Sequence, residues 1–184
     1  MLKIAVLALR GFLVAFGAIV LGLSVTLAKQ QAVGNPPSET SFSSFCGAFG
    51  IIVAALGILS FFIDKIPFMI MLGADALASV FYLAAAIALT IALKPVSSCT
   101  SNGIVERGQR IENKLLNGGC LESGYCPNAG SDNGNSYDSY TGGRCQRVQA
   151  DYVFEYLGFL FGVAVVAVTF LLYRRGKGGP QTFV

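Results

Sequence analysis

Two opposite charges inside apolar sequence are the residues of this chain best placed to do chemistry. Asp75 lies eight residues after Pro67, within an apolar stretch, and Arg10 lies at the start of an earlier one. Ionisable side chains in such stretches are costly, and they mark either an ion pair or a proton or cation site. We expect Asp75 to be held by Arg10, or by a hydroxyl such as that of Ser60 or Ser24, in a structural role.

A transport path would need several polar groups that converge in the membrane. We expect Asp75 to be the only deep carboxylate, because Glu155 falls one turn into the last apolar stretch, where it can reach water or Lys94. The sequence therefore favours a structural role for Asp75 over transport of protons or cations.

Four of the five cysteines fall in one polar segment. They are Cys99, Cys120, Cys126 and Cys145. The chain has no histidine and no C-x-x-C pair, so the spacing does not indicate a metal site, and disulfides in an oxidising compartment are expected. A Cys99–Cys145 bridge would close the segment at its base, and Cys120–Cys126 would staple an inner turn. The fifth cysteine, Cys46, is expected to be a buried apolar side chain.

Enzymatic motifs are absent from the sequence. Without histidine there is no imidazole base, and no glycine-rich phosphate-binding loop precedes a helix. The net charge of +3 is too small to indicate nucleic-acid binding. We predict that the chain is not an enzyme, has no catalytic residues, needs no cofactor or metal and binds no nucleic acid.

Four apolar stretches determine where these residues lie. Each is about 18 to 26 residues long, enough for a helix to cross a hydrocarbon core of roughly 30 Å. The predicted spans are 4–28, 45–63, 67–93 and 152–173. With 54% hydrophobic and 12% charged residues, the chain is predicted to form an all-α integral membrane four-helix bundle. This single domain covers residues 1–173, and residues 174–184 form a tail.

The predicted loop 94–151 is the only sizeable polar segment. Residues 101–117 carry an amphipathic pattern that predicts a short helix. From Asn117 to Gly143 the loop is rich in Gly, Asn, Ser, Asp and Tyr, which predicts turns held by the disulfides.

Positive charges near the span ends favour cytoplasmic termini. The side of the termini carries Lys3, Arg10, Lys65, Arg174, Arg175 and Lys177, and the other side carries Lys29, Lys94, Arg144 and Arg147. Cytoplasmic loops carry the excess of lysine and arginine in multi-pass proteins. We therefore expect loop 94–151, with its cysteines, to be extracellular and the tail 174–184 to be cytoplasmic.

Small residues at helical spacing predict close helix packing. Gly158 and Gly162 form a G-x-x-x-G pattern in the fourth span. We expect them to form the principal contact between copies of the chain unless they face the bundle interior. Similar spacings occur in the first span at Gly11/Ala15 and Ala18/Gly22.

The arrangement as a whole resembles the MARVEL-domain tetraspan proteins, and most closely the fungal non-classical export protein family. The resemblance covers nearly the whole chain. The turn Asp64-Lys65-Ile66-Pro67 and the pair Ser98-Cys99 are part of it, and its most specific parts are the run Arg144-Cys145-Gln146-Arg147-Val148-Gln149-Ala150 and the pair Leu9-Arg10. Cys99 and Cys145 match the family's loop cysteines and Asp75 matches its aspartate in the third span, whereas Cys120 and Cys126 look like part of an insertion.

The resemblance implies a plasma-membrane protein of the eisosome compartment that responds to sphingolipid and helps to organise microdomains. We expect a non-enzymatic scaffold that self-associates as a homo-oligomer and contacts membrane lipids, sphingolipid or sterol among them, and other membrane-domain proteins. One alternative is a tetraspanin-like adaptor that binds a partner through the outer loop. Another is a small transporter or channel.

Overall fold

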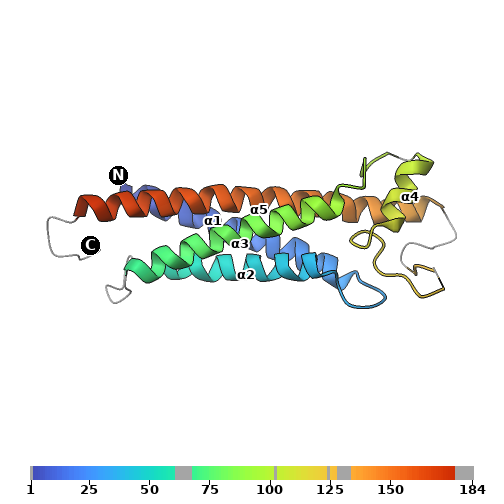
Figure 1. Cartoon of the computed structure of the whole chain (residues 1–184), viewed down its shortest axis with the longest axis horizontal. Helices are drawn as coiled ribbons and strands as arrows, with labels where there is room; N and C mark the ends of the chain where they lie inside the picture. Colours follow the sequence, from blue (N-terminus) through green and yellow to red (C-terminus); the bar gives the residue numbers. More distant parts are fainter. Residues whose placement is uncertain (1, 61–67, 102, 124, 128–133, 177–184) are drawn as a thin grey trace.

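The computed structural model describes residues 2–60, 68–101, 103–123, 125–127 and 134–176. Four long helices run along one axis, and a short one lies at one end (Figure 1). The elements are α1 (Leu2–Lys29), α2 (Ser38–Leu59), α3 (Phe68–Leu93), α4 (Ile104–Glu112) and α5 (Gly134–Gly176). The predicted turn 64–67 and the end of the tail, 177–184, lie outside the described residues.

The helices α1, α2, α3 and α5 are each long and apolar enough to cross a membrane. In hydrocarbon no water can satisfy backbone N–H and C=O groups, so apolar segments of this length fold as helices that pair these groups internally. The regular elements within the described ranges are all helical, which confirms the predicted all-α bundle with four candidate spans.

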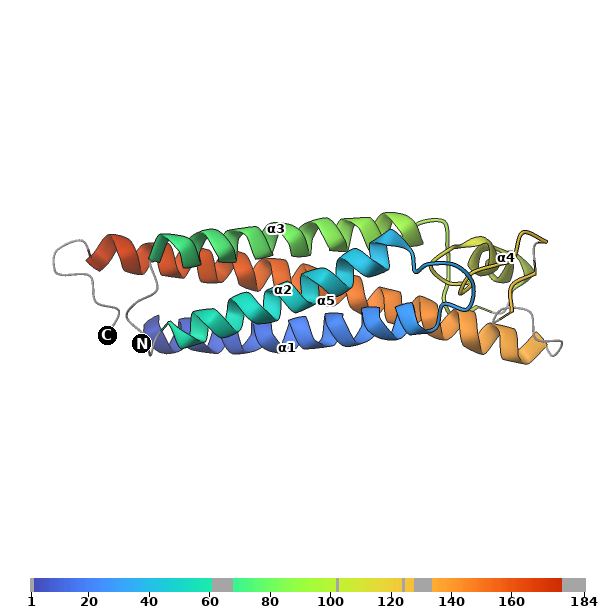
Figure 2. The ribbon, with the colours of Figure 1, turned by 90° about the horizontal axis from the view of Figure 1, so that it is seen from below.

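The four long helices form a ring. α1 packs against α2 and α5, and α3 packs against the same two helices. Figures 1 and 2 show that α1 begins and α5 ends at one end of the bundle, whereas α4 lies at the opposite end. We call the end with Leu2 and Gly176 the terminal side and the end with α4 the loop side.

Two helices begin earlier than the sequence predicted. α2 begins at Ser38, seven residues before the predicted span, and α5 begins at Gly134, eighteen residues before it. The prediction of turns from Asn117 to Gly143 is therefore wrong for its last ten residues. Relative to alanine, each glycine, asparagine or serine lowers the stability of a helix by up to about 1 kcal/mol. Tertiary contacts of this part of α5 override this low helix propensity. The short amphipathic helix predicted within 101–117 is confirmed as α4.

Apolar layers alternate with polar clusters along the bundle axis. An apolar layer near the loop side is built on Leu27, Leu89, Leu116 and Val148, and a smaller one nearer the terminal side contains Leu13 with Ala54 and Val165. In a membrane the outer surface is as apolar as the interior, so these layers contribute dispersion contacts more than burial from water. Buried polar side chains at other levels of the bundle supply the directional contacts.

Candidate functional site

Asp75 and Arg10 form a buried ion pair between α3 and α1. Arg10 Nη1 donates to Asp75 Oδ1 at 3.1 Å, and Nη2 donates to Oδ2 at 2.7 Å. The two residues are only 3% and 2% exposed. This bidentate geometry satisfies both carboxylate oxygens at once, so each charge has its partner inside the bundle. The hydroxyl of Ser60, one alternative partner, donates instead to the carbonyl of Gly57.

The guanidinium of Arg10 also fills the space left by a glycine of α2. A Cβ atom built on Gly57 would lie 1.5 Å from Arg10 Nη1 and 2.1 Å from Cζ. A side chain at position 57 would displace the guanidinium from this place. The ion pair therefore joins three helices, α1, α2 and α3, at one level of the bundle.

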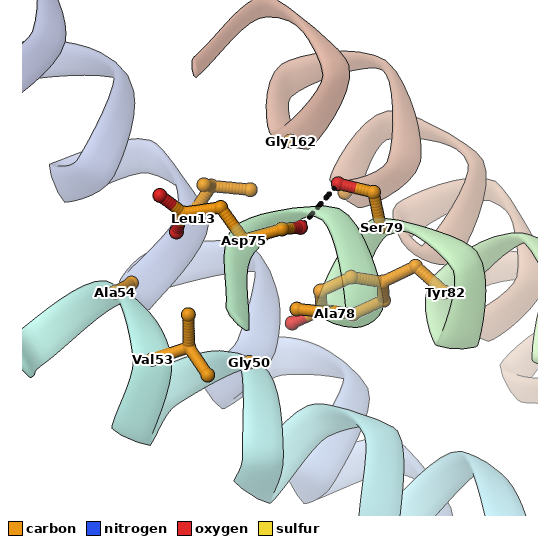
Figure 3. Close-up of a pocket in the computed structure, with 10 residues that line it drawn as sticks. Leu13, Gly50, Val53, Ala54, Asp75, Ala78, Ser79, Tyr82 and Gly162 are labelled. Carbon is orange, nitrogen blue, oxygen red and sulfur yellow. Dashed lines mark hydrogen bonds between the residues drawn. The ribbon is translucent and has the colours of Figure 1, made fainter. Parts of the chain in front are cut away.

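A small cavity lies beside this pair, bordered by Asp75, Ser79 and Tyr82 of α3 (Figure 3). Its volume is about 10 Å³, which is close to the space that a single water molecule needs. Ser79 Oγ donates to the backbone carbonyl of Asp75 at 2.8 Å, so this hydroxyl is already used within its own helix. A cavity of this size cannot admit an organic ligand or a lipid chain.

The two glycines of the G-x-x-x-G pattern face the bundle interior. A Cβ on Gly158 would lie 3.1 Å from the ring of Tyr82, and one on Gly162 would lie 2.3 Å from Ser79 Oγ. Both glycines are buried. They let α5 approach α3 closely, and they are not available for the contact between copies that the sequence suggested.

A second polar cluster joins α1, α2 and α5 nearer the loop side. Ser24 Oγ lies 2.6 Å from Asp151 Oδ2 and 2.8 Å from Ser43 Oγ. Ser43 Oγ in turn lies 3.2 Å from Asp151 Oδ2 and 2.5 Å from Glu155 Oε1. All four residues are 0% exposed. We call these four residues the carboxylate cluster.

The carboxylate cluster corrects two predictions. Glu155 does not reach water or Lys94, because Ser43 binds it inside the bundle. Asp75 is not the only deep carboxylate, because Asp151 and Glu155 are also buried. The signal that could have found them is their spacing of four residues, which places both on one helix face. The predicted boundary between loop and span at residue 151 hides this spacing, because it assigns Asp151 to the loop and Glu155 to the helix.

The comparison with family models decides the identity of the domain. The model of the membrane-associating domain MARVEL matches residues 3–168, nearly the whole chain. The chain belongs to the MARVEL family. A MARVEL domain indicates a membrane-associated, multi-pass protein with a role in membrane organisation. No curated protein and no solved structure matches the chain.

Two disulfides shape the long loop of this MARVEL chain. Cys99 is joined to Cys145, with 5.4 Å between their Cα atoms, and Cys120 is joined to Cys126, with 4.0 Å. The first bridge ties the segment that follows α3 to α5, and the second closes a small turn. Cys46 is buried and unpaired by disulfide, and its thiol donates to the carbonyl of Phe81 at 3.5 Å.

Arg144, the residue before the bridged Cys145, is a buried clamp for backbone carbonyls. Its Nη1 donates to Leu27 O at 3.0 Å, and its Nε and Nη2 both donate to Leu115 O, at 3.1 and 2.9 Å. The residue is 0% exposed. It thereby links the end of α1, the long loop and α5, which gives a physical reason for the Arg-Cys pair in the run that resembles the family.

The first loop of the MARVEL domain is tied to the long loop as well. Ala32 N donates to Gly118 O at 2.7 Å. Gly119 has a φ of +90°, and a Cβ there would lie 2.0 Å from Val33 O, so glycine meets both the conformation and the close approach. The first loop and the described part of the long loop are therefore held against each other.

Proposed function

We propose that this MARVEL protein is a non-enzymatic scaffold that organises a plasma-membrane microdomain by self-association and contact with membrane lipids. The observation that carries the proposal is a membrane-associating domain that extends over residues 3–168. Sphingolipid-responsive domains of the eisosome type are the proposed setting, with other proteins of those domains as partners. This finer assignment rests on the resemblance to the fungal non-classical export proteins.

The surface that supports self-association is a stripe of small residues on α1. Gly11, Ala15, Ala18 and Gly22 are all exposed, and their spacing places them on one helix face. A Cβ built on Gly11 or Gly22 meets no atom within 4 Å. Small residues at this spacing let a second membrane helix approach closely. The α1 stripe replaces Gly158 and Gly162 as the proposed contact between copies.

Aromatic side chains contact one another where α1 meets α5 and where α2 meets α3, and those that are exposed supply lipid-facing surface. Phe12 and Phe16 of α1 contact Phe161 of α5, with ring centroids 5.5 and 5.1 Å apart. On the other side, Phe45 of α2 lies 5.7 Å from Phe81 of α3 and is half exposed. These surfaces support contact with acyl chains or sterol, because the large apolar rings of phenylalanine pack well against such lipids.

For orientation, we propose cytoplasmic termini and an extracellular loop side. The positive charges near the span ends and the two disulfides support this arrangement. A membrane-impermeant reagent should reach residues 94–127 in intact cells and should not reach a tag placed after Val184. Labelling of the tag in intact cells would refute the orientation.

The scaffold proposal is tested with Gly11→Leu/Gly22→Leu, which adds bulk to the α1 stripe without a clash inside the bundle. We expect this variant to insert normally, since leucine favours the bilayer, and to form smaller oligomers in mild detergent and fewer clusters in cells. Gly73→Leu is the matched control, because it adds the same bulk at an exposed glycine of α3 where no atom lies within 4 Å.

The wild-type protein gives the decisive result. We expect ordered oligomers with bound lipid by native mass measurement, and clusters that respond to sphingolipid depletion. A dispersed monomer, unclustered and insensitive to sphingolipid, would refute the scaffold proposal.

A partner-binding adaptor is the second candidate, supported by exposed apolar residues on the loop side. Ile104 and Val105 at the start of α4 are 90% and 68% exposed. Large apolar side chains exposed together are typical of interaction sites. Ile104→Ser/Val105→Ser should abolish capture of a membrane partner under the adaptor hypothesis. Under the scaffold hypothesis it should leave oligomer size and clustering unchanged.

A further inference from the structure

The carboxylate cluster holds fewer hydrogen atoms than its geometry requires. Ser24, Ser43, Asp151 and Glu155 make four oxygen–oxygen contacts between 2.5 and 3.2 Å. The two serine hydroxyls supply one hydrogen each, and an ionised carboxylate supplies none. If both carboxylates were ionised, two of these contacts would join oxygen atoms with no hydrogen between them.

A single added proton removes half of this deficit and leaves only the longest contact, at 3.2 Å, without a hydrogen. With the proton on Asp151 Oδ2, Asp151 donates to Ser24, Ser24 donates to Ser43, and Ser43 donates to Glu155 Oε1. These are the three shortest contacts, at 2.6, 2.8 and 2.5 Å. With the proton on Glu155 the same chain runs in the opposite direction.

In the described part of the chain, buried polar atoms outside these four contacts also lack partners, so nothing there compensates two negative charges. Asp151 Oδ1 and Glu155 Oε2 have no hydrogen-bond partner among the described residues, although both residues are 0% exposed. The hydroxyl of Tyr82 on α3 is likewise buried and unpartnered within that part of the chain, and it lies within electrostatic range of Glu155. Two buried carboxylates without a cation are costly in this environment.

The surrounding charged groups do not neutralise the cluster. No lysine or arginine of the described chain forms an ion pair with Asp151 or Glu155. Arg147 on α5 donates to Gln30, and Lys29 at the end of α1 is exposed. Cys46 on α2 and Tyr82 on α3 are titratable neighbours of Glu155. Arg144 on α5 binds backbone carbonyls instead of the cluster.

We propose that the carboxylate cluster is a proton-binding site, in which Asp151 and Glu155 share one exchangeable proton through the hydroxyls of Ser24 and Ser43. In the transfer, the O–H bond of Asp151 breaks as its proton bonds to Ser24 Oγ. The hydrogen of Ser24 passes to Ser43, and that of Ser43 passes to Glu155. The net result is the transfer of one proton from Asp151 to Glu155. Each serine keeps one hydrogen, and the negative charge moves from Glu155 to Asp151. This site is independent of the proposed scaffold function.

Infrared spectroscopy of the full-length protein in lipid tests the proposal through the C=O stretch of a protonated carboxyl group. We expect a band equivalent to one carboxyl group per chain at neutral pH, and a shift of that band in D₂O. Glu155→Gln and Asp151→Asn should each remove it, because an amide supplies the missing hydrogen and the other carboxylate can then ionise. Glu112→Gln, at an exposed carboxylate of α4, should leave the band unchanged.

A band that persists in both Glu155→Gln and Asp151→Asn would overturn the proposal, as would its absence from the wild type. If either variant fails to fold, the wild-type protein alone decides the question. Loss of the band with rising pH supports the shared proton. Its loss on addition of Na⁺ or Li⁺ at constant pH would identify a metal cation as the occupant and overturn the proton.

Discussion

Adding one methyl group at Gly57 should break the ion pair that joins three helices. In Gly57→Ala the new Cβ would lie 1.5 Å from Arg10 Nη1, so the guanidinium has to move by about 2 Å to reach ordinary van der Waals separation. A shift of that size breaks the hydrogen bonds to Asp75, now 2.7 and 3.1 Å long. The variant therefore acts on a contact between α1 and α3 from a position on α2.

The expected magnitude follows from two opposing contributions. Breaking a buried pair while both charges stay buried costs about 3 to 5 kcal/mol. Alanine is a better helix former than glycine by about 1 kcal/mol. We expect Gly57→Ala to lower the free energy of unfolding by about 2 to 4 kcal/mol, the difference between these contributions. Gly73→Ala, where a Cβ meets no atom within 4 Å, should be neutral or slightly stabilising.

The assay is reversible unfolding in mixed detergent and SDS, followed by circular dichroism. The same substitution is also made in the double variant Arg10→Leu/Asp75→Leu, in which no guanidinium lies against Gly57. There Gly57→Ala should cost less than in the wild type, because the charge it displaces is absent. Equal costs in the two backgrounds, or a Gly57→Ala variant as stable as Gly73→Ala, would refute the argument.

Four further substitutions test other contacts in the same unfolding assay. Cys99→Ser should cost about 4 kcal/mol and Cys120→Ser about 2.2 kcal/mol in the chain-entropy model, because the first disulfide closes the longer loop; equal costs would contradict this account. Gly50→Ala places a Cβ 2.0 Å from the hydroxyl of Tyr82 and should cost about 1 to 3 kcal/mol by overpacking. Arg144→Met leaves the carbonyls of Leu27 and Leu115 without their donor, which should lower the free energy of unfolding by about 1 to 3 kcal/mol for each carbonyl. This variant should also speed proteolysis of the long loop, and an unchanged cleavage rate would count against the clamp.

The sequence was a good guide wherever one physical requirement allowed few solutions. Lipid leaves helices as the only structure for long apolar stretches, so the four candidate spans could be predicted from length and composition. A lone carboxylate and a lone guanidinium in apolar sequence must find partners, which pointed to Asp75 and Arg10. Cysteines at the two ends of one loop likewise indicated the bridge between Cys99 and Cys145.

The rotation of each helix about its own axis could not be predicted in the same way. In a soluble helix the apolar face points inward, but a membrane helix is apolar on every side, so hydropathy does not separate interior from surface. Gly158 and Gly162 could therefore be assigned to a contact between copies, although they pack against Tyr82 and Ser79. The error for Glu155 has a different cause: it lies one turn into the predicted span, but α5 begins at Gly134, so this residue is inside the bundle.

Polar residues and glycines are what determine the rotation of α1. Arg10 binds Asp75 near the terminal side, and Ser24 binds Asp151 nearer the loop side, so α1 is held at two levels by directional contacts. At 3.6 residues per turn, Gly11 and Gly22 lie about 100 to 160° around the helix from these two anchors, so they face away from them. Both anchors must be satisfied inside the bundle, and the α1 stripe is therefore held outward, toward lipid. The interior contacts thus determine which face of α1 is exposed on the bundle surface, where we propose that a second copy of the chain binds.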